Sequence, residues 1–343
     1  MQLLILGGGV FLGAATLDAA LARGHAVTVL NRGRSRSAWP AGVEVLTGDR
    51  SAARGLAALA GRHWDGVIDT CGYVPADVQA SAAALSTCGR YLFVSSVSAY
   101  ASFAHAPVRE DDPLADAAGI APDERDRQFY GPQKAACERQ IGAAFGARAT
   151  IVRPGLIVGP GDPTGRFSYW PWRVAAGGRM LVPDVPAPAA LQCIDVRDLA
   201  EWMVQLLERD VASAFNANGP VDGAALDWRR LIDECSAAVW ARGIDAAQAL
   251  PVGEAFLLEQ GITPWSELPL WVPSNDPELA GFMAIDSERA RAAGMRTRAL
   301  RETIAAVLDE AAPAPGDRRV EGKLTREHEA ELLAGSAVRT LPT

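Results

Sequence analysis

Lysine is almost absent from this chain. Only Lys134 and Lys323 are lysines among its 33 basic residues, and the others are arginines. Because the chain uses arginine wherever either cation would serve, each lysine is more informative than usual. The formal net charge of −8 over 343 residues argues against nucleic acid as the main partner.

Long apolar runs, cysteine pairs and histidine clusters are also missing. No stretch approaches the roughly 18–20 apolar residues of a membrane span, and the apolar start, MQLLILGGG, lacks the basic region of a signal peptide. The five cysteines are widely spread without a C-x-x-C, which indicates reduced thiols. The four histidines lie far apart, so we expect no metal site. Together these absences predict a cytoplasmic protein without a membrane partner, and an apolar fraction of 49% excludes a disordered chain.

Short apolar runs alternate with alanine-rich stretches through the first half of the chain. The runs expected to be strands are Gln2–Leu6, Ala26–Leu30, Val43–Thr47, Gly66–Thr70, Arg90–Ser95 and Ala149–Arg153. The helices expected between them are Gly13–Ala22, Ser51–Ala60, Pro75–Thr87 and Tyr130–Phe145. Alternation at this pitch predicts an α/β fold with a Rossmann-type, doubly wound parallel sheet.

The amino-acid composition changes after Pro154, where glycine, proline and tryptophan become frequent. We expect residues 1–163 to form a nucleotide-binding domain, to which 191–220 return through a helix at Val196–Arg209 and a strand at Ser213–Asn216. Residues 164–190 and 221–311 are expected to form a smaller, mostly helical substrate lobe, and 312–343 a C-terminal tail with a closing helix.

A glycine-rich turn follows the first expected strand. Gly7-Gly8-Gly9-Val10-Phe11-Leu12-Gly13 leads directly into a helix, whose N-terminus would direct free N–H groups at an anion. This context predicts a site for a dinucleotide pyrophosphate. The alternative is a purely structural turn.

The end of the second strand bears on which nicotinamide cofactor would bind. Asn31-Arg32-Gly33-Arg34 is neutral and then basic, where an acidic residue would bind the ribose hydroxyls of NAD. Guanidinium groups bind phosphate bidentately, so this segment favours NADP over NAD. A solvated basic loop is the alternative.

A tyrosine and a lysine open the helix expected at 130–145. The four-residue spacing of Tyr130 and Lys134 places both side chains on one helix face. An ammonium group close to a phenol stabilises the phenolate and lowers its pKa, which suits the tyrosine for proton transfer. Upstream, Ser95 and Ser96 end a buried strand, and a hydroxyl there can bind a substrate oxygen. The alternatives are a surface tyrosine with a solvated lysine, and hydroxyls that cap a strand end.

These motifs resemble the extended short-chain dehydrogenases/reductases, the NAD(P)-dependent epimerase/dehydratase family. The turn looks like the family's G-x-x-G-x-x-G, with Val10 at the middle glycine. Ser96 stands four residues before Tyr100, as the family's catalytic serine or threonine does, with Ser95 as the alternative register. The segments 153–162 and 192–200 resemble the family as well. The resemblance implies that Tyr130 transfers a proton, that Lys134 tunes it and holds the nicotinamide ribose, and that Ser96 orients the substrate.

The resemblance also suggests further ligands and a homodimer. It places Asp49 at the adenine, the run from Asp69 to Gly72 beside the cofactor, and the helices at 75–87 and 130–145 in a dimer interface. An ordinary cap of a strand end is the alternative for Asp49 and for the run from Asp69. The expected cofactor-binding residues are Gly7, Gly8, Gly9, Val10, Phe11, Leu12, Gly13, Asn31, Arg32, Arg34, Asp49, Arg50, Asp69, Thr70, Cys71, Gly72, Lys134 and Pro154.

Substrate residues are expected in the aromatic segment after the Asp162 loop. Arginine can hold a diphosphate and aromatic faces can stack on a base, which suggests a small-molecule substrate such as a sugar nucleotide. The candidates are Ser98, Arg166, Tyr169 and Arg173. A helix that packs its aromatic side chains under the second lobe explains the segment equally well. For the whole chain, the alternatives to an epimerase or dehydratase are a net NADPH-dependent reductase of a small carbonyl compound and a non-catalytic sensor or scaffold.

Overall fold

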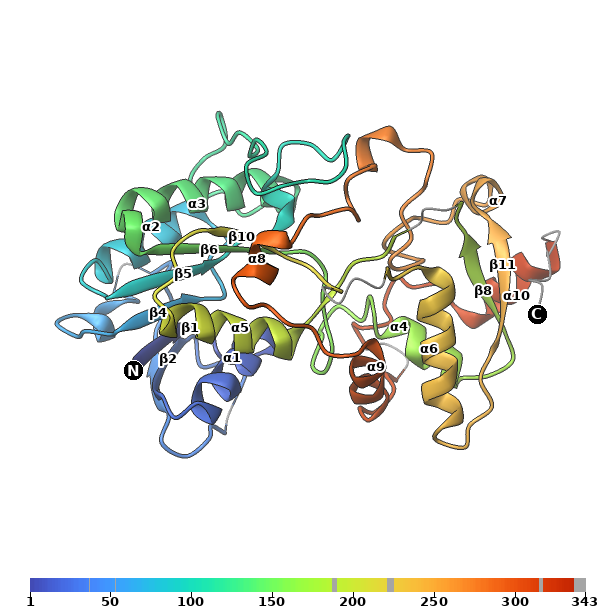
Figure 1. Ribbon diagram of the computed structural model, residues 1–343, viewed down its shortest axis with the longest axis horizontal. Coiled ribbons are helices and arrows are strands. Elements are labelled where there is room, and N and C mark those ends of the chain that lie inside the picture. Colours follow the sequence, from blue (N-terminus) through green and yellow to red (C-terminus); the bar gives the residue numbers. More distant parts are fainter. Residues whose placement is uncertain (37, 53, 187–189, 221–224, 315–316, 336–343) are drawn as a thin grey trace.

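The computed structural model describes residues 1–36, 38–52, 54–186, 190–220, 225–314 and 317–335. A larger lobe built on a parallel sheet, in which the N-terminus lies, is beside a smaller lobe (Figure 1). Within the described ranges, no helix is long and apolar enough to cross a membrane.

Seven parallel strands form the central sheet in the order β10-β6-β5-β4-β1-β2-β3. This order confirms the doubly wound, Rossmann-type sheet. The strands are β1 (Gln2–Leu6), β2 (Ala26–Asn31), β3 (Glu44–Thr47), β4 (Gly66–Asp69), β5 (Arg90–Val94), β6 (Ala149–Pro154) and β10 (Ala214–Ala217).

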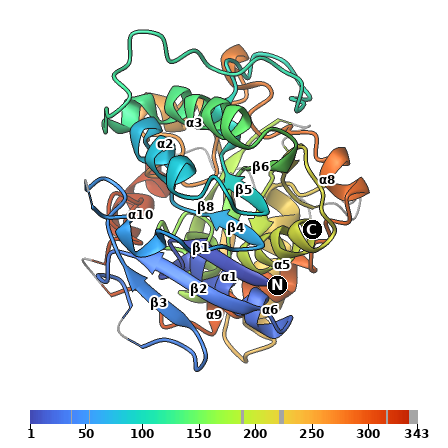
Figure 2. The same cartoon turned by 90° about the vertical axis from the view of Figure 1, so that its left-hand side faces the viewer.

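Helices cover both faces of the sheet (Figure 2). On one face lie α1 (Phe11–Ala22) and α5 (Val196–Glu208), and on the other lie α2 (Pro75–Ala84) and α3 (Tyr130–Phe145). Successive side chains of a strand point to opposite faces, so Leu3 and Ile5 of β1 join one apolar core while Leu4 and Leu6 join the other. Because both faces of the sheet are buried, its strands are apolar at nearly every position.

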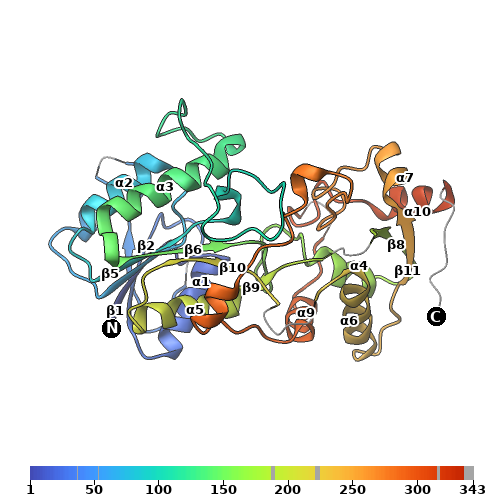
Figure 3. The same ribbon diagram turned by 45° about the horizontal axis from the view of Figure 1, so that its top comes forward.

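The smaller lobe is mainly helical and has its own core around Trp170 and Trp271. Its elements are α4 (Tyr169–Ala175), β8 (Arg179–Asp184), α6 (Trp228–Trp240), β11 (Gln248–Gly253), α7 (Glu254–Glu259), α9 (Leu300–Leu308) and α10 (Arg326–Gly335). The two-stranded parallel sheet of β8 and β11 was not predicted. Between the lobes lie the short β7 (Ile157–Val158) and β9 (Ile194–Asp195), which pair with each other, and α8 (Glu288–Ala292) packs on the larger lobe (Figure 3).

One expected helix, at residues 51–60, differs from the structure. Residues 51–60, apart from residue 53, which lies outside the described ranges, form turns with one short 3-10 helix at Ala57–Leu59. The segment folds back on the end of β3, where a Cβ on Gly55 would lie 1.6 Å from the Asp49 carbonyl oxygen. The stretch 286–311 contains two separate helices, α8 and α9. In the tail, a closing helix is present as α10, and residues 315–316 and 336–343 lie outside the described ranges.

Arg173 and Tyr169 belong to the packing of the smaller lobe, which corrects their expected role in substrate binding. The Arg173 guanidinium donates to Glu329 of α10 at 2.8 Å and to the carbonyl oxygens of Gly177 and Arg179. Tyr169 is buried, with its ring edge-on to Trp170. Tyr169 and Arg173 therefore fit the alternative interpretation of this segment, a helix that packs its aromatic side chains under the second lobe.

The buried Arg173–Glu329 pair should stabilise the smaller lobe, because Glu329 also accepts the backbone N–H of Leu181 in β8. Glu329→Ala would leave the Arg173 charge buried without a carboxylate partner, and we expect a loss of about 3–5 kcal/mol in the free energy of unfolding. Urea unfolding followed by tryptophan fluorescence measures this loss. Glu327→Ala, on the exposed side of α10, is the control, and equal losses in the two variants would contradict the assignment.

Candidate active site

A cleft of about 560 Å³ runs along the carboxyl ends of β1, β2, β4 and β5. In an open parallel sheet this edge is where ligands bind. Most of the residues expected at the cofactor meet here: Gly7, Gly8, Gly9, Val10, Phe11, Leu12, Gly13, Asn31, Arg32, Arg34, Asp49, Arg50, Thr70, Cys71, Lys134 and Pro154 line the cleft, with Ser96 and Tyr130.

The glycine-rich turn at one end of the cleft is tightly folded. A Cβ on Gly13 would lie 2.5 Å from the backbone nitrogen of Gly8, and a Cβ on Gly8, where φ is +64°, would lie 2.6 Å from Val29. No side chain larger than hydrogen fits at these two positions. Val10, at the middle position of the motif, has φ −142° and is 50% exposed, so its side chain needs no glycine-like backbone and stands at the mouth of the cleft.

The end of β2 presents polar groups to the cleft. The Asn31 side-chain oxygen accepts the N–H of Gly33, while its amide nitrogen is buried without a partner among the described residues. Arg32 and Arg34 are exposed there, close enough to Asp49 to help lower its pKa, for which hydrogen bonds from Ser51 are the main cause. This end of the cleft therefore has an unused donor and two cations that face solvent.

Asp69 lies behind the wall of the cleft, which differs from its expected place beside the cofactor. Its carboxylate accepts two bonds from the Arg50 guanidinium at 2.8 and 2.9 Å and one from the Tyr91 hydroxyl at 2.8 Å. Burial opposes ionisation, but the Arg50 charge and hydrogen bonds hold the Asp69 pKa below its ordinary value. Asp69 thus fixes Arg50 in the wall and has no free oxygen for a ligand.

At the other end of the cleft, α3 begins beside the end of β5. The hydroxyl of Tyr130 is hydrogen-bonded to Ser96. One turn later, the Lys134 ammonium donates to the carbonyl oxygens of Gly72 and Val94 at 2.7 and 2.8 Å. Tyr130, Ser96 and Lys134 therefore meet at one place, although they come from two separate segments of the chain.

The pKa of Tyr130 does not follow the expectation that Lys134 lowers it. Burial raises the pKa of Tyr130, and the cation that opposes this effect is Arg166, not Lys134. Burial also lowers the pKa of Lys134, to about 8. Tyr130 is therefore a neutral phenol at pH 7, ready to donate a proton.

Tyr73 was not singled out from the sequence, and Ser95 was expected only as the alternative register to Ser96. Tyr73 lines the cleft with its ring 6.4 Å from that of Tyr130, and the Lys134 ammonium lies 4.6 Å from the centre of the Tyr73 ring. Ser95 also lines the cleft, with a buried hydroxyl that has no partner among the described residues. Gly72 and Ser98, both expected at the site, lie outside the lining: Gly72 offers its carbonyl to Lys134, and the Ser98 carbonyl lies against Gly131.

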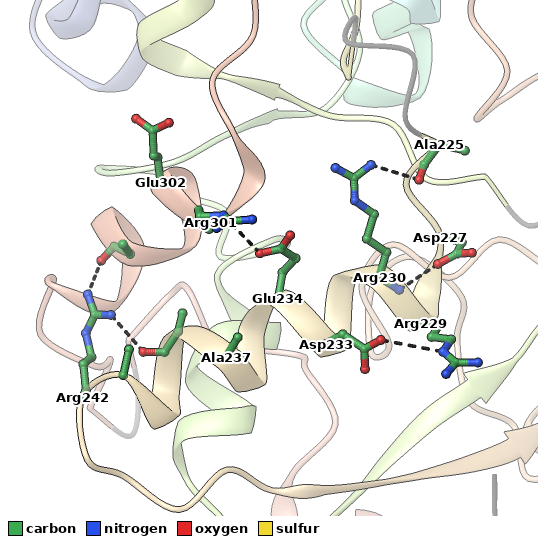
Figure 4. Close-up of a pocket in the computed structure, with 13 residues that line it drawn as sticks. Ala225, Asp227, Arg229, Arg230, Asp233, Glu234, Ala237, Arg242, Arg301 and Glu302 are labelled. Atoms are coloured by element: carbon green, nitrogen blue, oxygen red, sulfur yellow. Dashed lines mark hydrogen bonds and ion pairs between the residues drawn. The ribbon is translucent and has the colours of Figure 1, made fainter. Parts of the chain in front are cut away.

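A larger hollow of about 860 Å³ lies between α6 and α9 of the smaller lobe, far from these groups (Figure 4). Its floor is alanine and its rim is charged, but the charges neutralise one another: Arg229 pairs with Asp233, Arg301 with Glu234 and Arg242 with Asp309. Elsewhere, no group of three acidic, histidine or cysteine side chains within the described ranges could hold a metal ion.

Comparisons with known proteins identify the family. The model of the NAD dependent epimerase/dehydratase family matches residues 3–217. None of the curated proteins compared with the chain matches it.

Solved structures share the fold at low sequence identity. The UDP-Glc/GlcNAc 4-epimerase from Campylobacter jejuni has a TM-score of 0.65 at 17% identity, with 90% of this chain and 98% of that chain covered. The Bordetella bronchiseptica enzyme WbmH in complex with NAD⁺ has a TM-score of 0.64 at 18% identity, with 90% and 97% covered. The UDP-glucuronic acid 4-epimerase from Bacillus cereus in complex with NAD has 0.62 at 14%, with 90% and 98% covered. The chain belongs to the NAD-dependent epimerase/dehydratase family and is an NAD(P)-dependent enzyme of the short-chain dehydrogenase/reductase type.

Proposed function

We propose that the protein moves a hydride between a nicotinamide cofactor and a hydroxyl or carbonyl carbon, with Tyr130 as the acid or base. The observation that carries this proposal is the Tyr130–Ser96 hydrogen bond beside Lys134, in the same cleft as the glycine-rich turn. A sensor or scaffold would need the turn but not this second group of residues.

The residues of the cleft fit a dinucleotide. The glycine-rich turn leaves room for a pyrophosphate against its backbone, and the unpartnered amide of Asn31 suits the adenosine ribose. Two of the three Lys134 donors are used by carbonyl groups, which leaves the third for a hydroxyl of the nicotinamide ribose. A bound nicotinamide supplies the hydride exchange.

Side chains of the protein would transfer the proton that accompanies the hydride. The Ser96 hydroxyl and the Tyr130 hydroxyl, already bonded to each other, can both bind one substrate oxygen. With its pKa raised by burial, Tyr130 would donate its proton to a carbonyl oxygen as that carbon is reduced. In the opposite direction, the nearby charge of Arg166 favours the phenolate that accepts a proton from an alcohol.

Two finer points belong to this proposal. We favour NADP over NAD because Arg32 and Arg34 line the cleft as cations. The similar structures that were crystallised with a cofactor hold NAD. An NADP preference would also suit a net reductase. A sugar nucleotide is the first substrate class to test, because the similar structures include UDP-sugar epimerases. A cytoplasmic location agrees with five free thiols.

NADPH should bind at least several-fold more tightly than NADH. A guanidinium–phosphate contact contributes about 1.5–3 kcal/mol, so the double variant Arg32→Ala/Arg34→Ala should lose about tenfold or more in NADPH affinity and little in NADH affinity. Fluorescence titration measures both constants. The control is Arg36→Ala, because Arg36 lies over the Trp39 ring instead of the cleft. A wild-type preference for NADH would refute the assignment.

Tyr130→Phe should reduce turnover at least about a hundredfold and leave cofactor affinity intact, because it removes one positioned oxygen and little volume. Ser96→Ala should also reduce turnover at unchanged cofactor affinity. The assay uses a panel of carbonyl compounds and UDP-sugars, with nicotinamide absorbance for net redox and product analysis for epimerisation. Tyr73→Phe is the matched comparison in the same cleft. If Tyr130→Phe keeps near-full turnover, Tyr130 is not the acid and the sensor hypothesis gains.

We also propose a homodimer through α2 and α3, which lie side by side on one face of the sheet (Figure 2). Their outward positions include Ala83, Ala84, Ala143 and Ala144, all exposed and small enough for close helix packing about a two-fold axis. Light scattering should give a dimer mass for the wild type and a lower mass for Ala143→Arg. A monomer mass for the wild type at all concentrations would exclude this assembly.

A further inference from the structure

Tyr73 presents a half-exposed aromatic ring to the catalytic end of the cleft. Six large hydrophobic side chains are exposed in the part of the chain that the structure describes, and two of them, Tyr73 and Val10, line this cleft. Tyr73 is 51% exposed. Ligand clefts are lined by apolar and aromatic side chains that the ligand covers when it binds. The exposure of this ring therefore points to a ligand group that packs on it.

Packed neighbours fix the backbone of Tyr73 on both sides. Before it, Gly72 offers its carbonyl oxygen to the Lys134 ammonium at 2.7 Å, and a Cβ on Gly72 would lie 2.5 Å from the Phe93 ring. After it, Val74 is buried and α2 begins. The ring of Tyr73 is thus held at the cleft by a well-packed segment.

The Tyr73 ring covers one side of the Lys134 ammonium. The ammonium nitrogen lies 4.6 Å from the centre of the Tyr73 ring and 5.9 Å from the centre of the Tyr130 ring. Two backbone carbonyl groups accept two of its three N–H groups. A ligand oxygen that accepts the third N–H must approach a nitrogen flanked by these rings. Such a ligand lies next to Tyr73.

The aromatic ring of Tyr73, more than its hydroxyl, is suited to this contact. The hydroxyl forms no hydrogen bond within the described ranges. The ring centre is 6.4 Å from that of Tyr130, and the two planes are inclined by 38°. The face of a tyrosine ring attracts flat rings and the C–H edges of neighbouring groups. A nicotinamide riboside offers both a flat ring and a sugar.

The order of groups along the cleft indicates which part of a dinucleotide reaches Tyr73. The glycine-rich turn and the end of β2 lie at one end, and Tyr130 and Lys134 lie at the other. A pyrophosphate at the turn would leave the adenosine towards β2 and the nicotinamide riboside towards Lys134. Tyr73 therefore borders the nicotinamide half.

We propose that Tyr73 is a further cofactor-binding residue, whose ring packs against the nicotinamide riboside beside Lys134. The proposal rests on the proposed function in one respect, that the third Lys134 donor binds the nicotinamide ribose. It gives a residue outside the glycine-rich turn and outside the Tyr130–Lys134 pair a share in holding the reactive half of the cofactor.

Paired titrations locate this contact within the cofactor. NADPH and 2′,5′-ADP, which lacks the nicotinamide riboside, are titrated calorimetrically into the wild type and the variants. Because stacking on an aromatic side chain adds to the affinity of a flat group, Tyr73→Ala should weaken NADPH binding about fivefold or more. The same variant should bind 2′,5′-ADP as the wild type does. Tyr73→Phe keeps the ring and should bind both ligands normally.

The double variant Arg32→Ala/Arg34→Ala is the complementary control. It removes cations from the other end of the cleft and should weaken the binding of both NADPH and 2′,5′-ADP. Normal 2′,5′-ADP binding by Tyr73→Ala also shows that its cleft is folded. NADH and ADP give the same comparison for Tyr73, whichever cofactor the wild type prefers.

Unchanged NADPH affinity in Tyr73→Ala overturns the proposal, and a raised KM in that variant would then place the ring at the substrate. Weaker binding of both ligands by Tyr73→Ala, or an equal loss in Tyr73→Phe, also overturns it, because the contact would then be general or would belong to the hydroxyl. The proposed function fails separately. If Tyr130→Phe keeps full turnover while Tyr73→Ala loses only NADPH affinity, the role of Tyr130 is refuted and the Tyr73 contact is kept.

Discussion

The buried ammonium of Lys134 determines how the catalytic end of the cleft is put together. It donates to the carbonyl groups of Gly72 and Val94, which follow β4 and end β5, so it ties α3 to two strands of the sheet. The rings of Tyr73, Phe93 and Tyr130 surround it and supply further attraction. Burial of a cation costs free energy, and these contacts offset that cost. Because Tyr130 precedes Lys134 by one helical turn, the same contacts hold its hydroxyl at Ser96. A guanidinium is broader and planar, which explains a lysine here in a chain that otherwise uses arginine.

The two ends of the cleft depend on different physical conditions. At the glycine end the shape comes from missing side chains, because Gly8 and Gly13 approach each other and Val29 too closely for a Cβ. At the catalytic end it comes from filled space, where Lys134 and Tyr130 are buried among aromatic rings. The glycine-rich turn is formed by neighbouring residues, so a sequence motif can reveal it. The packing around Lys134 joins segments that are far apart in the chain, so a sequence motif cannot.

The sequence predicts the sheet, most of its helices and the glycine-rich turn, because each depends on a local pattern. The helix at 130–145 and the strand at 2–6 are predicted to the residue. The role of Arg173 could not be predicted, since its partner Glu329 is 156 residues away and only the folded chain shows that α10 packs there. The β8–β11 pair joins Arg179 to Gln248, 69 residues away, and its register follows from tertiary packing. Asp69 was expected at the cofactor because a carboxylate at a strand end can bind either a ligand or an arginine. Only the structure shows that its partner is Arg50.

Charge explains why the cleft suits anionic ligands in an acidic protein. Several surface arginines are neutralised by carboxylates, as Arg23 is by Glu208 and Arg125 is by Asp77, and such exposed pairs project little field. Arg32 and Arg34, which line the glycine end of the cleft, are cations outside these ion pairs. A concave surface with walls of low dielectric constant focuses the field of such cations, whereas the net charge of −8 repels anions from the rest of the surface. A ligand that carries a phosphate is therefore attracted to the glycine end of the cleft by the sign of its charge, before any contact with Tyr130.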